Sequence, residues 1–197
     1  MTAQVGDSFK YKSKEYNIVA ISKPLEFDLQ QYGITPEPCC TACWDGYWCE
    51  YEISEKGIIL KNFYVNSKDD YYPEINGVLP LSEEDEKDKM FHYMGHHYYK
   101  GVNIKMPYTG KIVVGKGFLR EYYIHMGYQR AWAYKMLKEL VFENGILIQE
   151  IDHSDMAKEL RKQIKEDPDF WEKLHYNIPM FIESSFDLSL ATKAWWV

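Results

Sequence analysis

Four cysteines, the whole supply of the chain, fall within eleven residues: Cys39, Cys40, Cys43 and Cys49. A cysteine thiolate can act as a nucleophile, a redox partner or a metal ligand, so this segment is where the sequence most directly offers chemistry. Cys40 and Cys43 form a C-x-x-C element. Zinc sites commonly combine two such elements, or one element with a pair of histidines. The cysteines alone therefore supply half of a zinc site.

Histidines that would complete such a site lie further along the chain. His92 and His96 are four residues apart, so they share one face if the segment is helical. Neutral imidazole is a common metal ligand near pH 7. We therefore predict that Cys40, Cys43, His92 and His96 are the ligands if the protein binds a metal, with zinc as the ion. If it does not, we expect no cofactor.

Two other interpretations of the cysteines remain open. Small, partly buried thiols are common in turns, and this is the interpretation that we favour. A redox C-x-x-C pair is the third option, but such pairs begin a helix beside a strand. Here Pro36 and Pro38 precede the element and an aromatic run follows it, which disfavours redox chemistry.

The elements that must position these residues are mostly strands. Alternating apolar and polar residues between turn residues predict strands over 8–12, 15–22, 48–54, 57–65, 98–105, 110–115, 133–143 and 145–151. Asn144–Gly145, between two apolar runs, is a strong hairpin signal because both residues tolerate positive φ. Residues 133–143 also show helical spacing of their apolar side chains, but the turn that follows them favours a strand.

The sequence contains two similar hairpin segments. Trp48–Leu60 and Met136–Ile148 both alternate up to a Glu-Lys-Gly or Glu-Asn-Gly turn and then enter a second apolar run. This similarity predicts an α+β fold in which two related, mostly antiparallel β units pack together. The acid-rich segment 82–89 is the best boundary. It divides the chain into a unit over 1–80, a charged and histidine-rich linker over 81–97 and a unit over 98–197, unless both units form one integrated domain.

Helices are expected mainly in the C-terminal quarter, although the acid-rich segment 82–89 could form one exposed helix. Residues 155–165 follow capping residues, and Asp167–Pro168 is a cap and first-turn pair that begins a second helix ending near His175. Helix and strand signals are therefore segregated along the chain, which is typical of α+β proteins.

Composition narrows the classes of function. The formal net charge of −7 disfavours sequence-independent binding of nucleic acid, which needs a basic surface. No stretch approaches the roughly 18–20 apolar residues that span a bilayer, and the first residues do not form a secretory signal. We therefore expect a cytoplasmic protein with reduced thiols.

Aromatic residues are the remaining notable group. The chain has 17 tyrosines, 9 phenylalanines and 6 tryptophans, and in strands such residues chiefly build the core and cross-strand pairs. A subset on the surface would bind a protein partner, since tyrosine and tryptophan are frequent hot spots. The candidates for this subset are Trp44, Tyr47, Tyr98, Tyr99 and Tyr123.

No nucleotide-binding, nucleophile-elbow or metalloprotease motif is present. The sequence therefore favours a non-catalytic, acidic intracellular protein that binds or neutralises a macromolecular partner, as toxin-neutralising immunity proteins do. The alternative is a metal-binding protein or metalloenzyme that uses the Cys39–Cys49 cluster with His92 and His96. A third option is a hydrolase or ligand-binding protein whose site lies between the two β units and includes His125, Tyr123 or Arg130. Oligomeric state does not follow from these patterns.

Overall fold

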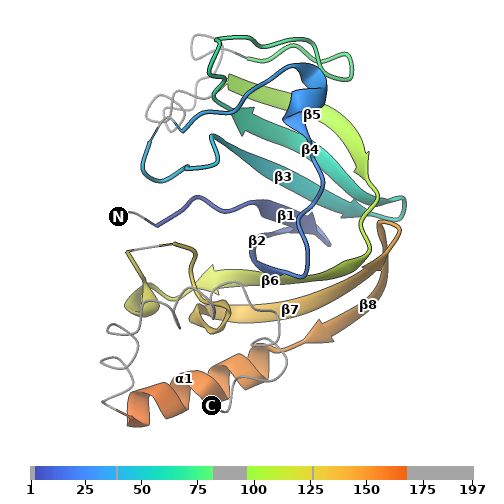
Figure 1. Cartoon of the computed structure of the whole chain (residues 1–197). Coiled ribbons are helices and arrows are strands. Elements are labelled where there is room, and N and C mark those ends of the chain that lie inside the picture. Colours follow the sequence, from blue (N-terminus) through green and yellow to red (C-terminus); the bar gives the residue numbers. More distant parts are fainter. Residues whose placement is uncertain (1–2, 39, 82–96, 126, 168–197) are drawn as a thin grey trace.

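A computed structural model describes residues 3–38, 40–81, 97–125 and 127–167. These residues form one mixed sheet of eight strands and a single α-helix at its C-terminal side (Figure 1). The strands are β1 (Ser8–Tyr11), β2 (Lys14–Ile21), β3 (Tyr47–Ser54), β4 (Gly57–Val65), β5 (His97–Met106), β6 (Gly110–Phe118), β7 (Tyr134–Glu143) and β8 (Ile146–Asp152). The α-helix is α1 (Ser154–Glu166), and short 3₁₀ turns cover Leu29–Tyr32, Arg120–Tyr122 and Ala131–Ala133. The α+β class predicted from the sequence is confirmed.

The strand order is β5-β4-β3-β1-β2-β6-β7-β8. Strand β1 is parallel to β3, and every other neighbouring pair is antiparallel. The two expected units therefore do not form separate sheets, because β5 pairs with β4 and β6 pairs with β2. The antiparallel hairpin β3–β4 has a counterpart in β7–β8, but β1 pairs with β2 whereas β5 does not pair with β6. The strand pairing of one half is thus repeated only in part in the other.

The predicted strands are present within one to three residues of their expected ends. The ambiguous segment is strand β7, which pairs with β6 on one side and β8 on the other. Its hairpin turn uses Asn144 and Gly145 at positive φ, as their types predict. Helix α1 matches the prediction for 155–165, whereas the linker 82–96 and the second predicted helix lie outside the described residues.

The sheet is so curved that the β3–β4 and β7–β8 turns meet (Figure 1). The Ile58 amide donates to the Gly145 carbonyl oxygen over 3.0 Å. A Cβ on Gly57 would lie 2.8 Å from that oxygen, so the contact requires glycine. The two similar hairpin segments of the sequence therefore touch at their turns.

Glu150 on β8 provides a second connection across the curved sheet. Its carboxylate accepts hydrogen bonds from the Tyr11 hydroxyl at 2.7 Å and from Lys12 Nζ at 2.6 Å, and it also pairs with Lys138. Hydrogen bonds from Lys12, Lys138 and Tyr11 lower the pKa of Glu150 to about 2. The β1–β2 turn is thereby held against β7 and β8.

The main core fills the inner side of the curve. It joins residues from most strands with Leu29, Ile34 and Ile75 of the connecting segments. Aromatic side chains pair across strands, as predicted: Phe63 stacks on Tyr99 with ring centroids 4.5 Å apart. On the opposite face, Trp48, Tyr64 and Tyr98 form a continuous stack over β3, β4 and β5.

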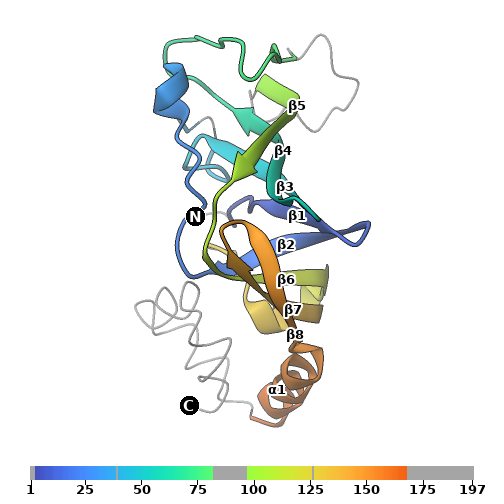
Figure 2. The same ribbon diagram turned by 90° about the vertical axis from the view of Figure 1, so that its right-hand side faces the viewer.

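A second core lies between the outer side of the sheet and α1 (Figure 2). Ala157 and Ile164 of the helix belong to the same buried cluster as Val113 and Leu137 of the sheet. Arg161 Nη1 fixes the helix by donating to two backbone carbonyls at 2.7 and 2.8 Å. Across the described residues, no helix has both the length and the apolar character needed to cross a membrane.

Buried charges also anchor the start of α1. Glu139 of β7 is fully buried, with Lys111 Nζ 2.7 Å from one carboxylate oxygen and His153 Nε2 3.1 Å from the other. Burial raises the pKa of Glu139, but the hydrogen bonds from Lys111 and His153 outweigh it and lower the pKa overall. The Glu139–Lys111 ion pair and the Glu139–His153 contact thus join β6, β7 and the start of α1.

Candidate functional site

The N-terminal segment lies between two loops at the end of the sheet opposite the β3–β4 turn. The Gln4 amide donates to the Gly127 carbonyl at 2.9 Å, and the Val5 amide donates to the Ala42 carbonyl at 2.8 Å. Residues 40–46, here called the cysteine loop, are thus tied through residues 3–6 to the β6–β7 connection. Since the loop precedes β3, this arrangement places the N-terminal segment beside the first residues of that strand.

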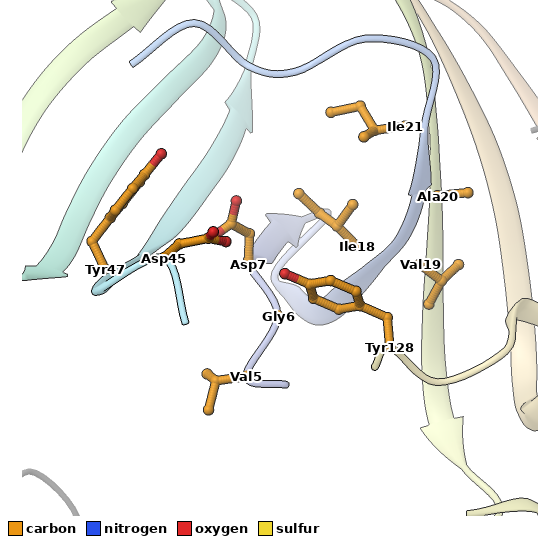
Figure 3. A pocket seen from close by; sticks show the side chains of 10 residues that line it. All are labelled: Val5, Gly6, Asp7, Ile18, Val19, Ala20, Ile21, Asp45, Tyr47 and Tyr128. Carbon is orange, nitrogen blue, oxygen red and sulfur yellow. The ribbon is translucent and has the colours of Figure 1, made fainter. Parts of the chain in front are cut away.

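A cavity of about 200 Å³ opens among these segments (Figure 3). It is lined by Val5, Gly6, Asp7, Ile18, Val19, Ala20, Ile21, Asp45, Tyr47 and Tyr128. Its walls therefore come from the N-terminal segment, β2, the cysteine loop with the start of β3, and the β6–β7 connection. Among the described residues that line the cavity, the only charged side chains are two carboxylates. We take this cavity, the acidic pocket, as the candidate functional site.

Asp7 is the central polar residue of the acidic pocket. Its Oδ1 accepts a hydrogen bond from the Cys49 amide at 2.7 Å. Among the described residues, no hydrogen bond to its other carboxylate oxygen is made. Burial raises the pKa of Asp7 to about 6, the Cys49 hydrogen bond opposes this, and the charge of Asp45 adds to it. A carboxyl with a pKa raised by enclosure in a cavity is a common feature of functional sites.

Asp45, Tyr47 and Tyr128 complete the polar part of the pocket. Asp45 is exposed at the mouth, and Figure 3 shows its carboxylate and the Tyr128 hydroxyl directed toward the same space as Asp7. Burial, with neighbouring acidic groups, raises the pKa of both tyrosines to about 12. Both phenols are therefore protonated at neutral pH, and the carboxylates carry the charge of the pocket.

The predicted zinc ligands are only partly within the described structure. Cys40 and Cys43 pair in a tight turn in which the Cys43 amide donates to the Cys40 carbonyl at 3.2 Å. Cys39, His92 and His96 lie outside the described residues. Within the described ranges, no group of three or more His, Cys, Asp or Glu side chains is arranged to hold a metal. The cysteine loop, of which this turn is part, contributes Asp45 to the lining of the acidic pocket.

Burial makes two of the thiols poor nucleophiles. It raises the pKa of Cys43 to about 11 and that of Cys49 well above its usual range. Relative to an ordinary thiol with a pKa of 9.0, the thiolate fraction of Cys43 at neutral pH is lower by roughly 100-fold. We expect iodoacetamide to modify Cys43 and Cys49 at least about 100-fold more slowly in the folded protein than in guanidinium chloride.

Peptide mass spectrometry over a time course would measure the rate for each cysteine. The unfolded protein is the control, because all its thiols are accessible. Fast modification of Cys43 in the folded protein would contradict this prediction and would indicate a thiolate suited to metal binding or redox chemistry.

The predicted partner-binding residues separate into two groups. Trp44 is 56% exposed, Tyr123 is also exposed, and Tyr47 lines the acidic pocket. The prediction for the neighbouring pair in β5 requires correction, since Tyr98 is 8% exposed and Tyr99 is 0% exposed. Their rings stack on Tyr64 and Phe63, so the pleat of β5 directs both into packed faces and away from a partner.

The third site considered from the sequence is not assembled. Tyr123 and His125 contact each other at a ring distance of 4.9 Å and are exposed. Arg130 lies over the Trp132 ring, and burial lowers its pKa to about 10. None of the three lines the acidic pocket.

Sequence reasoning missed Asp7 and Tyr128. An acid directly before a strand has the pattern of a solvated turn residue, and nothing nearby in the sequence shows that it is enclosed. The pocket can hold a proton near neutral pH on Asp7, or it can bind a cation between its carboxylates and tyrosine rings. The chain matches no protein-family model, no curated protein and no solved structure.

Proposed function

We propose that the protein is a non-catalytic binding protein that uses the acidic pocket and its rim to recognise a basic protein partner, in the manner of a toxin-neutralising immunity protein. The observation that carries this proposal is the combination, at one end of the sheet, of an acidic cavity and an exposed tryptophan on the adjoining loop. The net charge of −7 supports it, because a negative surface accelerates encounter with a basic partner.

Trp44 is the best candidate for an anchor in this interface. Its backbone amide donates to Gln4 Oε1 at 3.1 Å, and the Gln4 side chain donates back to the Thr41 carbonyl at 2.9 Å. The cysteine loop is thus held in place before a partner arrives. A pre-ordered loop with an exposed tryptophan binds at a lower entropic cost than a loop that must first be ordered.

Affinity purification from the native extract tests the proposal. We expect a basic protein to be retained in stoichiometric amount at low salt and to be released as the salt concentration rises. Trp44→Ala is expected to weaken the binding of that protein by about 30-fold, as for a typical hot-spot tryptophan.

Leu79→Ala is the matched control, because Leu79 is 65% exposed and does not line the acidic pocket. It should leave affinity unchanged. Retention of no stoichiometric partner, or an equal loss of affinity in the two variants, would contradict the proposal.

A further inference from the structure

The size of the acidic pocket restricts what it can enclose. Sites for drug-sized ligands usually measure about 300–1,000 Å³, whereas this cavity measures about 200 Å³. It therefore suits one amino-acid side chain or a small organic molecule. Ile18 and Ile21 of β2 provide an apolar wall against which an aliphatic chain would lie, and Val5 of the N-terminal segment adds a further apolar lining residue (Figure 3).

The polar groups restrict the chemistry of the ligand. Asp7 and Asp45 are negative, and no Lys, Arg or His is found in the described lining. The aromatic rings of Tyr47 and Tyr128 add negative π faces, which attract ammonium and guanidinium groups. The second oxygen of Asp7 accepts no hydrogen bond from the described residues. A ligand in the cavity can donate a charged hydrogen bond to this oxygen, and such bonds are stronger than those between neutral groups.

We infer that the acidic pocket is a cation site that encloses the ammonium or guanidinium end of one Lys or Arg side chain from the protein partner, an inference that rests on the proposed function. The methylene stem lies along Ile18 and Ile21, and the charged end reaches Asp7 with Asp45 at the mouth. A Lys or Arg side chain of the partner thus matches the cavity both in size and in the sign of its charge.

Binding of this cation depends on pH through Asp7. Among the described residues, the titratable groups around Asp7 are Asp45 and Cys43 of the cysteine loop, Tyr47, Cys49 and Tyr51 of β3, and Tyr128 of the β6–β7 connection. Burial raises the pKa values of the tyrosines and thiols, so these groups are neutral at pH 5 and at pH 7. With a pKa of about 6, Asp7 is mainly ionised at pH 7 and mainly protonated at pH 5. The affinity for a cation should therefore fall about tenfold between these values.

Amino-acid derivatives provide a direct test on the full-length chain. Nα-acetyl-lysine methylamide and Nα-acetyl-arginine methylamide are titrated while the Cys49 amide and the rings of Tyr47 and Tyr128 are followed by NMR. We expect saturable shifts with dissociation constants of about 1–10 mM, which is reasonable for a single side chain. Nα-acetyl-norleucine methylamide, which keeps the stem and lacks the charge, should produce no saturable shift.

Two variants and one control test whether the lysine derivative binds at Asp7 and Asp45. Asp7→Asn keeps an acceptor for the Cys49 amide and removes the charge, so it should weaken binding of the lysine derivative by at least about tenfold. Asp45→Asn should weaken it less, because Asp45 is exposed. Glu143→Gln removes an equal charge at the opposite end of the sheet and should change nothing. Equal shifts with the norleucine derivative, no shift with either cation, or equal weakening by Glu143→Gln would overturn the inference.

The partner experiment separates this inference from the proposed function. If wild-type protein retains a partner and Asp7→Asn retains it with the same affinity, the binding function stands and the cation site is wrong. If the lysine derivative binds at the pocket but no partner is retained, the cation site stands and the protein-binding function is wrong. Tighter binding of n-butylamine than of the lysine derivative would show that the pocket takes a free amine and would overturn its assignment to a protein side chain.

Discussion

Asp7→Asn should make the protein more stable at pH 7, although it removes a residue from the candidate site. The pKa of this carboxyl is about 6 in the folded protein, against an ordinary value of 3.8. Between these values the folded state binds more protons than the unfolded state, so the free energy of unfolding falls as the pH rises through this window. At pH 7 the full destabilisation that results from the raised pKa of Asp7 is present. Asparagine carries no charge and avoids the penalty at every pH.

The expected gain is about 1–3 kcal/mol at pH 7, because each unit of pKa difference corresponds to about 1.4 kcal/mol and the pocket is partly open to solvent. At pH 4 the gain should nearly vanish, since Asp7 is then protonated in the folded protein. The side-chain oxygen of asparagine can still accept the Cys49 amide hydrogen bond, so the backbone at this point is preserved.

Urea unfolding at pH 4 and pH 7 measures the difference. Asp69→Asn is the control, since Asp69 is exposed and does not line the pocket, and its effect should stay within about 0.5 kcal/mol. A gain of equal size at both pH values, or a loss at pH 7, would contradict the prediction. A variant that is more stable but binds the lysine derivative less tightly would show the trade-off that is common at functional sites.

Gly46→Ala is expected to lower the free energy of unfolding by about 3–5 kcal/mol, which is the largest loss of stability that we predict. Gly46 lies between Asp45 and Tyr47 with φ +74°, and an added Cβ would lie 2.6–2.7 Å from three backbone atoms of Glu37. The Glu37 segment cannot move away easily, because both its backbone amide and its carbonyl oxygen are hydrogen-bonded to Asn66 at 2.9 Å. Relief of the clash must displace the start of β3, together with two residues of the acidic pocket.

Gly77→Ala separates the steric clash from the cost of the backbone conformation. Gly77 has φ +80°, and a Cβ there would meet no atom within 4 Å. This variant should cost only the conformational penalty of about 1–2 kcal/mol. Urea unfolding of both variants gives the comparison. Equal losses of stability would mean that the clash with Glu37 adds nothing to the cost of placing alanine at a positive φ. The pocket would then not depend on the close approach of Gly46 to Glu37.

Local chemistry determined the secondary structure. Apolar alternation and turn residues such as Asn144–Gly145 specify hairpins between neighbours in the chain, and β7 and β8 formed as these signals predicted. Side-chain alternation also accounts for the aromatic pairs, because facing residues on adjacent strands bring Phe63 and Tyr99 together. The sequence did not predict which strands are adjacent, since hairpin signals carry no information on the pairing of β1 with β3 or of β4 with β5.

The candidate site depended on these non-local pairings. The cysteines stood out by type and spacing, yet the described part of their loop serves to support a pocket whose central group, Asp7, has the sequence pattern of a solvated turn. Its burial follows from contact with residues more than 35 positions away, including Cys49 and Tyr128. The sequence by itself determined the strands, their turns, the helix and the acidic charge, because these depend on residue type and on near neighbours. Only the tertiary structure decided the strand order, the burial of Tyr99 and the assembly of the acidic pocket, because each results from packing between segments that the chain connects over long loops.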